Sequence, residues 1–207
     1  IISSWRQLKE IHFDGQAVLS NEILLNPLPS LKSISRDDYH GSLADGAEGK
    51  PRDRLLLLLV KSSVETLQSL VFNYTELNDA LTETFLSSTF NCLTKITLWD
   101  FDIPLSCHLD KVLLQFPSLR HLSCSRRHLK SAISLTELPK LRYLTLLDCD
   151  DKFVNDLGII LARLHLVTLT LGGLLDRSVK DYSKYTIFEL ARKAKVKFEW
   201  SGGWIEN

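Results

Sequence analysis

Seven segments of the chain follow the apolar pattern L-x-x-L-x-L, where x is any residue, and this repeat limits the possible folds more than any other feature. Other apolar residues replace leucine at some positions, and Arg36 stands at one position where an apolar residue belongs. The first residues of these segments are separated by 23, 36, 26, 26, 22 and 25 residues. Internal periods of about 20 to 50 residues are typical of chains built from one repeated structural unit. Chance richness in leucine would not keep this register. The first residues are Leu8, Leu31, Leu67, Leu93, Leu119, Leu141 and Leu166.

Each repeat predicts one short strand, because its last two apolar positions lie two residues apart and therefore point to the same face. A single strand cannot bury that face, whereas stacked repeats pair their strands in parallel and enclose a shared core. Parallel strands need crossover connections, and apolar residues recur at helical spacing in four connecting segments. Alternation of Val196, Phe198 and Trp200 predicts a final strand. The expected helices span residues 78–86, 108–116, 151–164 and 185–195.

We therefore expect one α/β domain over residues 1–207, a leucine-rich-repeat solenoid of about seven repeats. Its curved parallel sheet would line the concave side and its helices the convex side. The one long spacing indicates an insertion, which we place in a loop at 37–54 because glycine, proline and charged residues are dense there. That loop is either a tolerated surface insertion or a segment that folds over a partner. Residues 185–207 would cap the C-terminal end of the core.

Two segments resemble the leucine-rich repeats of F-box proteins, of the ribonuclease-inhibitor-like or cysteine-containing class. They are FPSLRHLSC at 116–124 and LPKLRYLTL at 138–146. Cys149 also stands where repeats of that class often carry cysteine. The resemblance implies the substrate-recognition part of a cullin–RING ubiquitin ligase subunit. The same position holds other residues in four of the other repeats, namely Thr75, Phe101, Arg127 and Leu174.

No F-box helix motif is present in the sequence, so docking to a cullin-ligase adaptor would need an F-box upstream of it. We interpret the start at Ile1 and the lack of methionine as signs of a processed or excised product. Two other functions stay open. One is a structural leucine-rich-repeat subunit of a large stable assembly, and the other is the repeat region of an immune receptor.

Residues that alternate with the core leucines would project from the concave face and meet a protein partner there. Trp99, Tyr143 and Leu147 are large side chains at such positions, and Trp and Tyr are favoured as interface anchors. Another possibility is that Trp99 folds back onto a neighbouring strand, or that these are isolated surface residues. Near them, Asp100, Arg126 and Asp148 are expected to form a polar rim. The candidate partner-binding residues are Trp99, Tyr143, Leu147, Asp100, Arg126, Asp148, His121 and Val71.

Composition and motifs disfavour several classes of function. Lys and Arg number 25 and so do Asp and Glu, which argues against a nucleic-acid partner. The longest apolar run, residues 55–60, is far shorter than the roughly 20 residues that cross a bilayer. No phosphate-binding loop, nucleophile motif or metal-ligand spacing is present, so we expect no enzymatic activity, cofactor or metal. Four cysteines without a CxxC pair indicate buried free thiols in the cytoplasm or nucleus.

Overall fold

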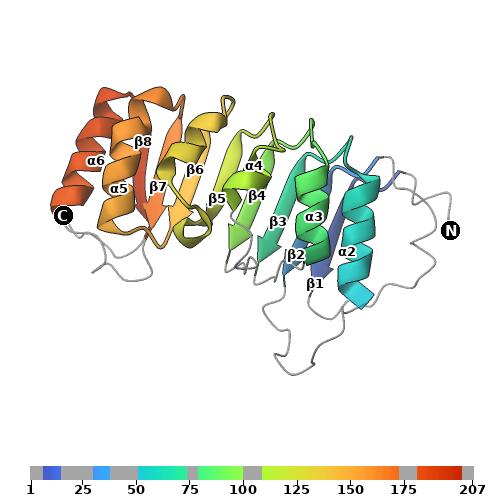
Figure 1. The fold of residues 1–207 in the computed structure, drawn as a ribbon. Helices are drawn as coiled ribbons and strands as arrows, with labels where there is room; N and C mark the ends of the chain where they lie inside the picture. Colours follow the sequence, from blue (N-terminus) through green and yellow to red (C-terminus); the bar gives the residue numbers. More distant parts are fainter. Residues whose placement is uncertain are drawn as a thin grey trace, which may run out of the picture.

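The computed structural model describes residues 7–14, 30–37, 51–73, 79–99, 109–172 and 181–201. Over these residues the chain is an α/β fold with a single eight-stranded parallel sheet, whose strand order follows the sequence from β1 to β8 (Figure 1). All seven strands expected from the repeat are present, and the final strand is the eighth. The strands are β1 Glu10–Asp14, β2 Ser33–Asp37, β3 Ser69–Asn73, β4 Lys95–Trp99, β5 His121–Ser125, β6 Tyr143–Leu147, β7 Thr168–Gly172 and β8 Lys197–Ser201.

The helices alternate with the strands and lie on one face of the sheet (Figure 1). Between β5 and β6 the connection consists of two 3-10 helices, and a third one follows α5. The α-helices are α2 Pro51–Ser62, α3 Asp79–Ser87, α4 Leu109–Leu113, α5 Asp151–Ile160 and α6 Asp181–Lys193, and the 3-10 helices are η2 Arg126–His128, η3 Ala132–Glu137 and η4 Leu161–Arg163.

The core lies between the sheet and the helices, because the second and fourth residues of the five-residue strands point toward the helical side. In β3 these are Leu70 and Phe72, which are 2% and 1% exposed. Equivalent residues are paired in register from strand to strand, and from β2 to β7 they are apolar except for Arg36, so the core is continuous along the sheet. Phe85, Phe90 and Phe116 pack together beneath β3 and β4, with ring centroids 5.5 to 5.9 Å apart. Phe116 meets the other two rings edge to face.

The crossover from β2 to β3 differs from the expected loop at 37–54. Asp37 is the last residue of β2 and Pro51 is the first residue of helix α2, while residues 38–50 lie outside the described residues. Proline is favoured in the first helical turn, where its missing N–H has no helical partner. The run of leucines that follows is buried at Leu55, Leu56 and Leu59. An apolar run without polar interruptions has no visible helical period, so the helix was not predicted.

Two large apolar side chains within the expected helices, at 78–86 and 185–195, are exposed. Leu86 near the end of α3 is 39% exposed, and Phe188 in α6 is 46% exposed. Helix α6 also begins at Asp181, four residues before the expected start. The inward positions of α6 are Ile187 and Ala191, which are almost fully buried and lie four residues apart.

The C-terminal end of the sheet is formed by α6 and β8, while residues 202–207 of the expected cap at 185–207 lie outside the described residues. Lys195 adopts a left-handed backbone with φ 58°, and Val196 N–H then donates to Ala191 O, a helix-ending arrangement. Strand β8 approaches β7 closely at Gly172, where an added methyl group would lie 2.4 Å from the carbonyl oxygen of Ser201. Glycine is therefore required there by space.

Candidate interaction surface

The first, third and fifth residues of the strands point away from the helices and form what we call the open face of the sheet. Because neighbouring strands are paired in register, these residues form three rows that cross the sheet. The pairing stops one residue before the exit row between β4 and β5 and between β6 and β7. In strands β3 to β7 the entry row contains Ser69, Lys95, His121, Tyr143 and Thr168. The middle row contains Val71, Thr97, Ser123, Thr145 and Thr170. The exit row contains Asn73, Trp99, Ser125, Leu147 and Gly172.

The structure places the three expected anchors on this face. Trp99, in the exit row, and Tyr143, in the entry row, are each 41% exposed. Leu147, in the exit row, is half-buried and lies two strands from Trp99, about 10 Å away at the spacing of strands in a sheet. Val71 is half-buried in the middle row between Ser35 and Thr97.

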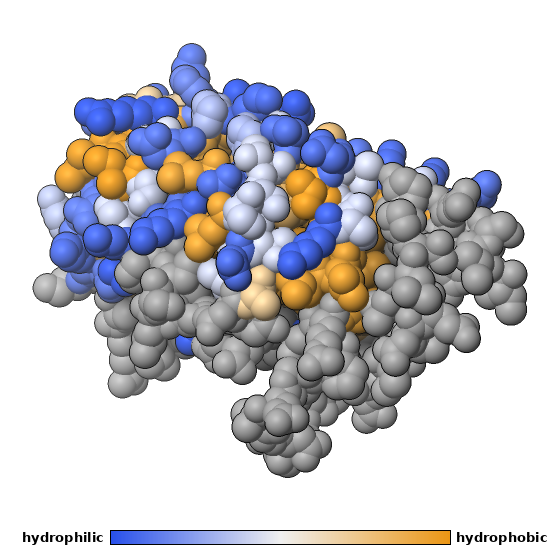
Figure 2. Space-filling view, turned by 45° about the vertical axis from the view of Figure 1, so that its right-hand side comes forward, coloured by the Kyte–Doolittle hydropathy of each residue, from blue (hydrophilic) through white to orange (hydrophobic). Residues whose placement is uncertain are grey.

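Exposure alone does not single out these residues, since the helical side also has exposed apolar side chains. Ile159 in α5 is 76% exposed and Tyr182 in α6 is 77% exposed. Figure 2 shows that, on the helical side turned toward the α2 end, apolar residues form separate patches among hydrophilic ones. The open-face residues differ because they project from paired strands, which hold their relative positions fixed.

His121 and Tyr143 form the best-defined contact of the open face. They are paired in register on β5 and β6, and their rings are parallel and stacked with centroids 4.3 Å apart. Partial burial lowers the pKa of His121 below its usual 6.5, a hydrogen bond to the backbone of Thr94 raises it by less, and the positive charges of Lys95 and Arg120 lower it further. The imidazole is therefore neutral at neutral pH.

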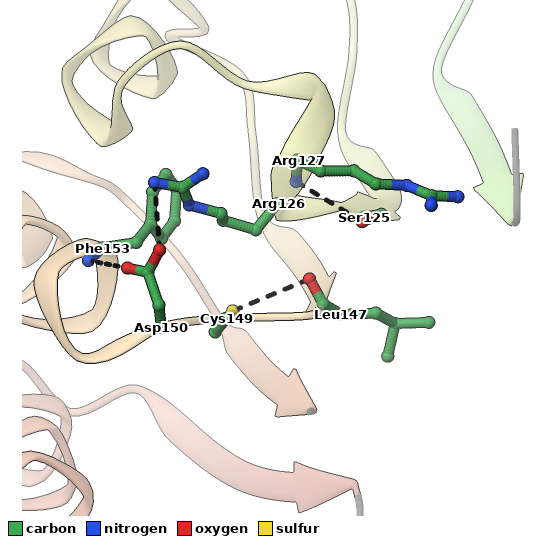
Figure 3. Close-up of polar contacts among 7 residues, drawn as sticks. All are labelled: Ser125, Arg126, Arg127, Leu147, Cys149, Asp150 and Phe153. Atoms are coloured by element: carbon green, nitrogen blue, oxygen red, sulfur yellow. Dashed lines mark hydrogen bonds and ion pairs between the residues drawn. The ribbon is translucent and has the colours of Figure 1, made fainter. Parts of the chain in front are cut away.

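Arg126, the first of the expected polar-rim residues, is tied into the fold beyond the end of β5 (Figure 3). Arg126 Nη2 lies 3.2 Å from Asp150 Oδ2, and the guanidinium stands over the Phe153 ring, 5.3 Å from its centroid. Asp150 also accepts a 2.7 Å hydrogen bond from the Phe153 N–H, which caps helix α5. Arg126 is thus held on the helical side of β5, with a partner that the sequence-based prediction did not include.

Asp148 is the second expected rim residue, and its carboxylate faces β5. Its Oδ2 atom accepts a 2.6 Å hydrogen bond from Ser125 Oγ, and its backbone is left-handed with φ 56°. Ser125 itself is 2% exposed, although the alternation predicts that it projects to solvent. Leu147 is directed away from the Asp150 and Phe153 contact in Figure 3. Asp100, the remaining rim candidate, lies outside the described residues.

Lys95 and Arg120 complete the surroundings of His121 but were not among the predicted binding residues. Both side chains are exposed. Lys95 is the register partner of His121, and Arg120 precedes His121 in the chain. The sequence contains a signal that could have identified Arg120. Arginine follows the first leucine in two consecutive repeats, at Arg120 and Arg142.

The cysteines of the described region are free thiols. Cys92 is exposed, whereas Cys124 and Cys149 are buried, so the expectation of buried thiols holds for the latter two. Burial, together with the charges of Asp148 and Asp150, raises the pKa of Cys149 to about 12. Its Sγ atom lies 3.9 Å from Leu147 O (Figure 3). Because the thiolate is the reactive form, Cys149 is inert in the folded chain. Cys107 lies outside the described residues.

Comparisons of the chain with protein-family models, curated proteins and solved structures find no match. Among the described residues, no group of three or more His, Cys, Asp or Glu side chains is arranged to hold a metal ion. None of the helices in that part of the chain has both the length and the apolar character needed to cross a membrane.

Proposed function

We propose that the chain is a leucine-rich-repeat solenoid whose open face binds another protein, and that its activity is recognition rather than catalysis. The repeat spacing, the strand order that follows the sequence and the placement of the helices on one face support this assignment. In such repeats the open face of the sheet is the surface available to a partner.

The observation that carries the proposal is the presence of Trp99 and Tyr143 on the open face, each 41% exposed, with Leu147 nearby. Large aromatic side chains held by paired strands lose little conformational entropy on binding and bury a large area. Interface anchors of this kind contribute about 2 kcal/mol or more each.

We further propose that the recognised protein is a substrate of an F-box-like ubiquitin ligase, working in the cytoplasm or nucleus. The support is the resemblance of residues 116–124 and 138–146 to the repeats of F-box proteins. In this proposal the cullin-ligase adaptor would dock on an F-box encoded outside this sequence.

Trp99→Ala in the full-length natural protein tests the proposal, with Ile159→Ala as the matched control on the helical side. Each variant is tagged, expressed in the native cells and purified, and the co-purified proteins are quantified by mass spectrometry. Trp99→Ala should reduce a defined partner by about 30-fold, because 2 kcal/mol of anchor energy is lost. Ile159→Ala should leave that partner unchanged, and both variants should keep the unfolding temperature within a few degrees of the parent.

The identities of the co-purified proteins then test two proposals separately: that the open face recognises a protein, and that this protein is a ubiquitin-ligase substrate. A cullin and an F-box adaptor, recovered with a partner that depends on Trp99, support the ligase assignment. A fixed set of subunits at equal stoichiometry without a cullin overturns it in favour of a structural subunit. A partner set that Trp99→Ala and Ile159→Ala leave equally unchanged overturns recognition through the open face.

A further inference from the structure

The entry end of strands β4 to β6 carries two positively charged side chains. Lys95 and Arg120 are exposed, and neither forms an ion pair within the described part of the chain. The side-chain charges that act on His121 are these two, and both are positive. The open face contains four acidic residues. Glu10 lies three strands from Lys95, about 14 Å, and Glu199 is paired with Lys197 at 2.6 Å. Asp14 and Asp37 are the last residues of β1 and β2, at the exit end rather than at the entry end where Lys95 and Arg120 lie.

The exit end of the same strands carries two large apolar side chains. Trp99 on β4 and Leu147 on β6 are separated by β5, whose last residue, Ser125, is buried. The Ser125 hydroxyl donates to Asp148, so it does not offer a polar group to a partner. Between the two ends, the middle row contributes only the small side chains of Thr97, Ser123 and Thr145.

The two ends are separated by four residues along each strand, as between Lys95 and Trp99 or between Tyr143 and Leu147. This corresponds to about 13 Å at 3.3 Å per residue. An extended partner segment that lies along β5 would cover the same distance with four of its own residues. It would therefore place one side chain at the positive end and another at the apolar end.

We propose that strands β4 to β6 bind an extended acidic segment of a protein, with a carboxylate at Lys95 and Arg120 and an aromatic or aliphatic side chain, about four residues away, at Trp99 and Leu147. The assignment rests on the proposed recognition function and adds the chemistry of the partner. Complementary charge sets specificity and association rate, while the apolar anchor supplies affinity.

A displayed library of random 12-residue peptides, selected on the immobilised full chain, tests the assignment even while the natural partner is unidentified. Selected sequences should be enriched in Asp or Glu about four residues from an aromatic or aliphatic residue. A representative selected peptide should bind about tenfold more weakly to the variant Lys95→Glu/Arg120→Glu, because two attractive charges become repulsive. Binding should also weaken as salt is raised above 0.15 M, where charges more than about 8 Å apart are screened.

The matched control reverses two exposed lysines on the helices, Lys152→Glu/Lys193→Glu, which changes net charge equally. This control should retain the affinity of the parent. Trp99→Ala, measured with the same peptide, establishes whether binding takes place on the open face.

These variants separate failure of the acidic assignment from failure of the proposed function. One outcome is that the selected peptides are neutral or basic, that their binding is weakened by Trp99→Ala, and that Lys95→Glu/Arg120→Glu does not change their affinity. This outcome overturns the acidic segment, while recognition by the open face stands. If no selected peptide depends on Trp99, or the library yields none, both are overturned.

Discussion

His121 is a residue whose proton affinity is set by its neighbours on the sheet. Burial beside Tyr143 and the charges of Lys95 and Arg120 lower its pKa below 6.5. We predict that Lys95→Gln/Arg120→Gln raises this pKa, but not to 6.5, since burial is the largest cause. Titration of the His121 ring protons by NMR measures both values. A parent pKa at or above 6.5, or one insensitive to the two substitutions, would contradict this account.

The lowered pKa of His121 makes the fold less stable as the pH falls. With a pKa lower in the folded than in the unfolded chain, His121 takes up its proton more readily when unfolded. Its contribution to stability is therefore complete above about pH 6.5 and is lost as the pH falls below that value. His121→Asn should remove this part of the pH dependence in urea unfolding between pH 7 and 5.5.

Which residues face solvent was largely predictable from a period of two, as Trp99, Tyr143 and His121 illustrate. The hydrogen-bond and ion-pair partners of polar residues were not predictable in this way. Arg126 was expected at a solvent-exposed rim, but it pairs with Asp150, which lies beyond the end of the next strand. A strand period determines the face of a side chain, whereas the position of a loop carboxylate depends on the path of the chain between strands.

Helix α5 shows how one acidic residue can serve two roles at an element boundary. Asp150 accepts the Phe153 N–H at 2.7 Å and pairs with Arg126 at 3.2 Å (Figure 3). We predict that Asp150→Ala lowers the free energy of unfolding by about 1 to 2 kcal/mol, mostly through the lost cap. The ion pair adds less than about 1 kcal/mol, because its side chains are 28% and 48% exposed.

Asp150→Asn separates the two roles, since an amide oxygen still accepts the Phe153 N–H while the charge is removed. It should cost less than about 1 kcal/mol in urea unfolding followed by tryptophan fluorescence. If Asp150→Asn lowers the free energy of unfolding as much as Asp150→Ala does, the ion pair with Arg126 stabilises the start of α5 more than the cap does.

Strands were more predictable than helices at the scale of elements. The strand signal repeats seven times, and each copy supports the others, so even β2 with Arg36 in an apolar position was located. Helix α2 was missed because consecutive leucines at 55–59 give no amphipathic period. Helix α6 was predicted four residues short, since its first turn, from Asp181, contributes few buried side chains.

The molecule as a whole is held together by contacts between neighbours in sequence. Strand order follows the chain, so each strand is paired only with the strands before and after it. Architectures of this kind have stability that is approximately a sum of units and of interfaces between adjacent units. Even spacing of the repeats made this order predictable, because strands stacked in sequence need only short crossovers.

Because each strand pairs only with its neighbours, we predict that a destabilising substitution at one end of the sheet mainly destabilises the strands at that end. Leu169 in β7 is fully buried, and Leu169→Ala should lower the free energy of unfolding by about 2 to 5 kcal/mol through the cavity it leaves. Hydrogen exchange followed by mass spectrometry should show faster exchange in β6, β7, β8 and α6, while β3 and β4 keep the protection of the parent. Leu70→Ala in β3 is the matched substitution at the equivalent row and should give the reverse pattern. If both variants accelerate exchange equally over all strands, the eight strands unfold as one cooperative unit, and binding at β4 to β6 would be sensitive to defects anywhere in the sheet.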